Sequence, residues 1–110
     1  MQKAIQSNKN GTGADDNDVL LTFGTDVSPL CDTWTFHCTA GTFDVQVSNL
    51  GTAGTWSNAI SLTDLTAEDS APVLEGTAGN VYGLRGKFFA VRVLQKGATA
   101  TTVYAVAGSL

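Results

Sequence analysis

The sequence predicts an all-β protein, an antiparallel β-sandwich of about seven or eight strands preceded by a flexible N-terminal arm. Apolar and polar residues alternate over short segments, which is typical of half-buried strands. Turn residues separate these segments at short intervals, a spacing that favours a sandwich. Only 15% of the residues are charged, and Thr, Gly, Ala and Val are abundant. The chain has 110 residues, a length that fits one domain.

Two regions are distinguished by composition. Residues 1–17 are polar and contain glycine, so we expect a flexible arm there and the sandwich over residues 18–110. An acidic cluster at positions 15–18 ends the arm, but apolar residues 19–21 follow at once. A calcium loop would instead continue through a glycine to a distal glutamate. The cluster is therefore interpreted as a solvated turn before the first strand.

The clearest early strand covers residues 33–38. Trp34, Phe36 and Cys38 share one face and are predicted to point into the core, which leaves His37 on the exposed face. Shorter alternating segments are expected at residues 19–23, 56–62, 73–74 and 81–84.

The other strong strands lie on either side of the centre of the chain. Residues 43–48 alternate so that Asp44 is predicted to face water. Residues 88–94 form the strongest predicted strand. Lys96-Gly97-Ala98 is a candidate hairpin turn, after which residues 101–107 are expected to be the antiparallel partner of residues 88–94.

The net charge argues against nucleic-acid binding, and the hydropathy argues against a membrane-spanning segment. The formal net charge is −4 and the sequence pI is about 4.5, although four of the six basic residues lie between positions 85 and 96. A nucleic-acid surface normally needs a larger positive excess. No apolar run approaches the roughly 18 residues of a membrane span, and no signal peptide is evident. We expect synthesis in the cytosol.

No catalytic, metal or cofactor site is predicted. His37 is the only histidine, and its expected exposure does not favour a triad. Cys31 and Cys38 are too few for a zinc site. Seven extended residues separate them by roughly 23 Å, far beyond the Cα spacing of a disulfide, so we expect no bridge. Five carboxylates are considered and interpreted as solvated: Asp44, Asp64, Glu68, Asp69 and Glu75.

Aromatic residues are the candidates for ligand or partner contact. Trp56, Tyr82 and Tyr104 have amphipathic rings that suit a sugar platform or a protein interface. Arg92 lies in the locally basic strand and is a candidate contact for an acidic partner.

Residues 41–108 resemble a small β-sandwich domain of tailed-bacteriophage structural proteins. The similarity rests on the strand Gly41–Ser48, the pair Thr55-Trp56, the segment Phe88–Val93 ending in Val-Arg-Val, and the turn Gly97–Thr99. A final Ala/Thr/Val strand at residues 101–108 completes the pattern. The sequence departs from this pattern by being longer between positions 63 and 84 and by lacking the common Asp-Gly in the first loop.

The resemblance implies a non-enzymatic structural protein of the virion, without cofactors. A single domain with a polar arm resembles a capsid decoration or cement protein that binds the major capsid protein as a homo-oligomer, with a trimer expected. The alternative is a glycan- or receptor-binding module of a phage tail or fibre, which would use the aromatic candidates.

Overall fold

The computed structural model describes residues 6–50, 55–69 and 71–109. Within these ranges the chain forms ten strands and a 3₁₀ turn, η1 (Ser28–Leu30). The strands are β1 (Gln6–Gly13), β2 (Val19–Phe23), β3 (Thr33–Ala40), β4 (Thr42–Ser48), β5 (Leu62–Asp64), β6 (Pro72–Val73), β7 (Gly76–Thr77), β8 (Val81–Arg85), β9 (Ala90–Gln95) and β10 (Thr101–Gly108).

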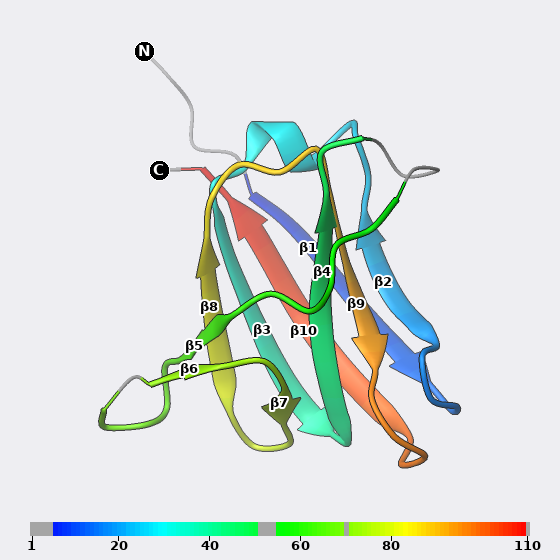
Figure 1. The fold of residues 1–110 in the computed structure, drawn as a ribbon. Coiled ribbons are helices and arrows are strands. Elements are labelled where there is room, and N and C mark those ends of the chain that lie inside the picture. The colour runs from blue at the N-terminus through cyan, green and yellow to red at the C-terminus, as the bar shows by residue number, and fades with distance from the viewer. Residues whose placement is uncertain (1–5, 51–54, 70, 110) are drawn as a thin grey trace.

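The strands form two antiparallel sheets that pack face to face (Figure 1). One sheet has six strands in the order β1-β10-β3-β8-β5-β6, and the other has four in the order β2-β9-β4-β7. The predicted all-β sandwich is therefore confirmed. No helix in the described ranges has the length and hydropathy needed to cross a membrane.

The core lies between the sheets and contains the side chains that alternation predicts. Trp34, Phe36 and Cys38 are buried, and His37 between them is exposed. Three edge-on or tilted ring pairs organise the core. They are Phe23–Trp34 at 5.3 Å, Phe36–Phe43 at 6.0 Å and Phe43–Tyr82 at 5.6 Å between ring centroids.

The expectation of a flexible arm is wrong for residues 6–13. They form β1, which pairs with β10 along its whole length, from Gln6 opposite Gly108 to Gly13 opposite Thr101. The sandwich therefore includes residues assigned to the arm; residues 1–5 lie outside the described part. β6 overlaps the segment expected at residues 73–74, so β1 and the two-residue strand β7 are the strands that raise the expected eight to ten. Neither has the apolar alternation by which sequence periodicity detects a strand.

Two glycines allow β1 to approach β2. A Cβ at Gly11 would lie 1.9 Å from the backbone oxygen of Leu20, and one at Gly13 would lie 2.6 Å from the Leu20 side chain. Both distances are far below van der Waals contact. Gly11 therefore allows the β1 backbone to pack directly on the β2 backbone, which no other residue type permits, whereas the space beside Gly13 is filled by side chains.

The predicted hairpin between residues 88–94 and 101–107 is also wrong. The turn at Gly97, where φ is +88°, does reverse the chain. It connects β9 in one sheet to β10 in the other, however, because β9 already has both ladders occupied, by β2 and β4. The hydroxyl of Thr101 anchors the crossing by donating to the backbone oxygen of Thr42 at 3.2 Å.

Candidate interaction surface

The outward side of the six-stranded sheet, called here the open face, is the candidate interaction surface. Directly opposite residues of neighbouring strands point the same way, so strand pairing aligns them in rows. The first row is Asn10, Tyr104, His37 and Val81; the second is Asn8, Val106, Thr35, Gly83 and Thr63; the third is Gln6, Gly108, Thr33 and Arg85. The alternate positions, such as Ala105 and Phe36, are buried in the core.

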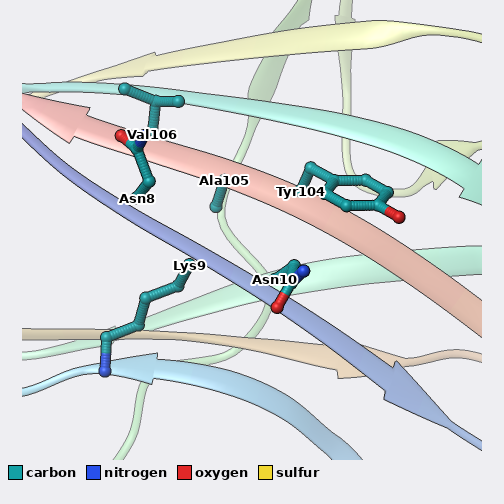
Figure 2. Close-up of a pocket in the computed structure, with 6 residues that line it drawn as sticks. All are labelled: Asn8, Lys9, Asn10, Tyr104, Ala105 and Val106. Carbon is teal, nitrogen blue, oxygen red and sulfur yellow. The ribbon is translucent and has the colours of Figure 1, made fainter.

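Three shallow depressions lie along the open face. One of about 310 Å³ surrounds Tyr104 and Val106 and is bordered by Asn8 and Asn10 (Figure 2). A second of about 430 Å³ involves β3, β5 and β8 and is lined in part by Leu65. A third, again about 310 Å³, lies where β1, β3 and β10 meet at the end of the sheet. The three depressions adjoin one another, because neighbouring depressions are lined by the same strands.

The strands that form most of the open face carry no carboxylate. None of the ten acidic residues of this acidic chain lies in β1, β10, β3 or β8. These strands hold two basic residues, Lys9 and Arg85. Lys9 extends away from Asn8 and Asn10 (Figure 2), and its ammonium lies 5.7 Å from the centre of the Phe23 ring. Because burying a carboxylate is costly, this face is cheaper to desolvate than the acidic remainder of the surface.

Apolar groups are exposed on the same face. Tyr104 is 48% exposed and Val106 is 39% exposed, and both lie on β10 in adjacent rows. Leu65 is exposed beside Gly83. An exposed aromatic ring among neutral polar side chains is the composition found at protein interfaces.

Tyr82, a predicted site residue, is a core residue instead. It is only 2% exposed, and its hydroxyl accepts a hydrogen bond from the backbone N–H of Thr77 at 2.8 Å. Gly76 provides the space, since a Cβ there would lie 2.2 Å from the Phe43 ring and 2.8 Å from the Tyr82 ring. Tyr82 is therefore not available to a ligand.

Trp56 and Arg92 form a pair on the other sheet. The Arg92 guanidinium stacks on the Trp56 ring at 4.4 Å, and its Nε and Nη2 donate to Oε1 of Gln46 at 2.9 and 2.6 Å. Arg92 alternates with the buried Val91 and Val93, which places it on the outer side of the four-stranded sheet. The structure therefore does not bring Trp56, Tyr82 and Tyr104 together, and only Tyr104 lies on the open face.

Asp44 also departs from its prediction. It is only 6% exposed, not solvated, and its Oδ1 has no hydrogen-bond partner among the described residues. Its Oδ2 lies 3.8 Å from Nζ of Lys96. Burial raises the pKa of the Asp44 carboxyl, and Lys96 opposes this shift only in part.

Replacing Asp44 by asparagine is expected to change how stability depends on pH. When folding raises the pKa of a carboxyl, that carboxyl lowers stability as pH rises from its unfolded-state pKa through its folded-state pKa. The loss persists at higher pH. The Asp44→Asn variant should therefore be at least as stable as the parent at pH 7. This advantage should vanish as pH falls below about 3.9, where the carboxyl is protonated in both states. Thermal unfolding from pH 3 to 8 measures the difference.

Asp26→Asn is the matched control, because Asp26 is exposed and its loss changes the net charge equally. The reverse result, an Asp44→Asn variant that loses stability relative to the parent as pH rises, would mean that the ionised carboxylate stabilises the fold.

The remaining candidates occupy unrelated places. Cys31 and Cys38 are both free and buried, and burial raises the pKa of each thiol, which disfavours the reactive thiolate. His37 stands in the first row between Tyr104 and Val81. Across residues 6–50, 55–69 and 71–109, no three His, Cys, Asp or Glu side chains are placed to hold a metal ion.

Most residues of the open face were not singled out from the sequence. Asn8 and Asn10 fall in the segment expected to be flexible, and Thr35 and Val106 are ordinary strand residues. The sequence signal that could have indicated this face is the distribution of charge. The segments that form the neighbouring strands β1, β10, β3 and β8 contain no acidic residue.

Comparisons with known proteins give likenesses of fold. No family model matches the chain, and no curated protein matches its sequence. The SPBc2 prophage-derived protein YomS is 12% identical with a TM-score of 0.74, over 99% of this chain and 97% of that one. The PBSX exported protein XepA is 8% identical with a TM-score of 0.72, over 99% of this chain and 39% of that one. The chain is thus similar in fold to a prophage-derived protein of about its own length and to an exported protein of which it spans less than half.

Proposed function

We propose that this chain is a non-enzymatic structural protein of a bacteriophage particle, a decoration or cement protein that binds the major capsid protein through the open face. The observation that supports this most strongly is a broad sheet face, free of carboxylates on its main strands, in an otherwise acidic protein. A protein that binds by area and symmetry needs no reactive group. The likeness in fold to a prophage-derived protein supports the same class.

The size of the open face is adequate for such a contact. Three of its strands span about 27 Å each and β8, β5 and β6 are shorter, so at a spacing of about 4.8 Å the sheet has a flat area of roughly 550 Å². A stable interface buries about 800 Å² on each partner. The relief of the side chains and the rim around the strands add to the flat area, which brings the open face to the size of a specific contact. Homo-oligomerisation, with the trimer as the expected form, would repeat that contact around a symmetric shell.

The copy number of this chain in purified particles tests the proposal. A lattice-wide decoration protein should be present in on the order of hundreds of copies, in a simple ratio to the shell subunit. Quantitative mass spectrometry of purified particles measures this ratio. A much smaller number would place the chain at a vertex or tail, and its absence from the particle would contradict the proposed location.

The alternative, a glycan-binding module, is favoured by one specific arrangement. Asn10, Tyr104 and His37 stand side by side in the first row, all exposed, beside the depression shown in Figure 2. An aromatic ring flanked by an amide and an imidazole can contact the apolar face of a sugar and its hydroxyls. This site is smaller than the three-ring platform expected from the sequence.

Substituting Tyr104 distinguishes the two proposals. If the site binds a glycan, binding on a glycan array should disappear in Tyr104→Ala and persist in Trp56→Ala, whose ring lies on the other sheet. No signal from the unmodified chain with any glycan would reject this alternative and leave the structural role in place.

A further inference from the structure

β1 differs from the other long strands because it contributes no apolar side chain to the core. Its sequence is QSNKNGTG, and Gly13 is its only buried residue. In contrast, β10 beside it buries Val103, Ala105 and Ala107. Apolar burial is the main force that holds strands in a sandwich. β1 is held instead by its backbone pairing with β10 and by the close approach of Gly11 to the β2 backbone. A hydrogen bond between the hydroxyls of Thr12 and Thr102 at 3.2 Å and the Lys9 ammonium near the Phe23 ring add to this.

Detachment of β1 would therefore cost less than detachment of another strand. Segments with few buried apolar contacts open at lower free energy than the rest of a protein. The core between the sheets would remain in place, because its large side chains come from other strands. The backbone edge of β10 would then be unpaired along eight residues, and such an edge accepts any strand of matching register.

The connection after β1 is suited to act as a hinge. Beyond it, the chain is fixed to the β9–β10 turn: the backbone N–H of Gly97 donates to Oδ1 of Asp16 at 2.7 Å, and the N–H of Asn17 donates to the oxygen of Gln95 at 2.8 Å. Opening at Ala14 and Asp15 therefore requires the loss of three local hydrogen bonds. Their backbone N–H groups donate to the Asp18 carboxylate at 3.1 and 3.0 Å, and the Asp15 backbone oxygen accepts from the Asp18 N–H at 3.1 Å. The freed strand of eight residues would reach about 26 Å.

The segment that fits the vacated edge best is β1 of a second copy. It restores every backbone pair in the same register and again places a glycine at position 11, where the backbone of β2 leaves no space for a Cβ. The outer edge of β1 itself is less open to strand addition, because the inward-pointing Lys9 places a charge beneath it. The outer edge of β1 is thus protected by a charge, whereas the edge of β10 is covered only by β1, a strand that can detach.

We propose that β1 exchanges between copies of this chain, so that β1 of one subunit pairs with β10 of its neighbour. Exchange of an identical element is a low-cost route to oligomers, since it creates no new interface. It would link adjacent subunits through backbone hydrogen bonds while leaving the open face of each available. The exchange is a property of the purified chain and does not depend on the proposed location in a phage particle.

Asn8 and Val106 give a direct test, because they are paired opposite each other on β1 and β10. Two chains are prepared, one with Asn8→Cys and the other with Val106→Cys, mixed at high concentration and oxidised mildly. A disulfide between them requires β1 of the first chain to lie on β10 of the second. Both positions are exposed, so circular dichroism should show an unchanged fold.

The control replaces the second chain by one carrying Thr35→Cys, which is equally on the open face but one strand further from β1. We expect about tenfold more mixed disulfide for the 8/106 mixture than for the 8/35 mixture, since only the first pair meets the geometry of a disulfide. Equal yields, or no mixed disulfide while the double variant Asn8→Cys/Val106→Cys bridges within one chain, would overturn the proposal. Hydrogen exchange of the unmodified chain is a second readout, and β1 amides as protected as those of β3 would also overturn it.

Discussion

Replacement of Phe43 by alanine is expected to lower the free energy of unfolding by about 3–5 kcal/mol. The Phe43 side chain is fully buried and lies between Phe36 and Tyr82 in the ring cluster. Its removal leaves a cavity that the surrounding rings cannot fill. For a domain of this size that loss is a large part of the total stability. Urea unfolding followed by tryptophan fluorescence measures it.

Phe89→Ala is the matched control, because the same atoms are removed from a side chain that is 43% exposed. It should cost below about 1 kcal/mol. If Phe43→Ala is too unstable to purify, Phe43→Leu keeps most of the volume and should cost less than the alanine variant. Equal effects at positions 43 and 89 would contradict the described core.

Introduction of a carboxylate at the centre of the open face, as Val106→Asp, is expected to weaken binding to the capsid about a hundredfold or more, since an unpaired buried charge is strongly unfavourable. The fold should survive, because Val106 is 39% exposed. Co-sedimentation of the purified chain with particles that lack it measures the binding.

Val19→Asp is the control for this experiment. Val19 is 49% exposed and lies on β2 in the other sheet, so the same substitution adds the same charge away from the open face. The proposal expects Val19→Asp to bind as the parent does. Equal loss in both variants would mean that net charge, not the open face, controls binding.

Hydrophobic alternation predicted the fold class and the strands that supply the core. It placed Trp34 and Phe36 inward and His37 outward because each of these side chains follows the pleat of one regular strand. It did not find β1, whose polar residues pair with β10 mainly through the backbone. Backbone pairing does not depend on apolar residues, so hydrophobic alternation cannot distinguish a polar strand from a flexible arm.

The long-range arrangement was less accessible from the sequence. Turn residues at Gly97 predicted that the chain reverses, but they carry no information about which sheet receives the next strand. Asp44 and Tyr82 were misplaced for a related reason. Their burial depends on elements distant in sequence, namely Lys96 for the carboxylate and the opening beside Gly76 for the ring.

The site could be predicted only in part. Tyr104 was singled out as an aromatic residue and does lie on the open face, whereas Trp56 and Arg92 stack against each other on the opposite sheet. The rows of the open face combine residues from strands far apart in the chain, and only the pairing of those strands brings them together.

Electron cryomicroscopy of particles that carry this chain tests the central claim most directly. The account predicts density for the sandwich on the capsid surface, oriented so that β10 and β3 face the shell and the ring of Tyr104 is buried in the contact. A sandwich bound with the four-stranded sheet against the shell, and with Tyr104 open to solvent, would contradict it.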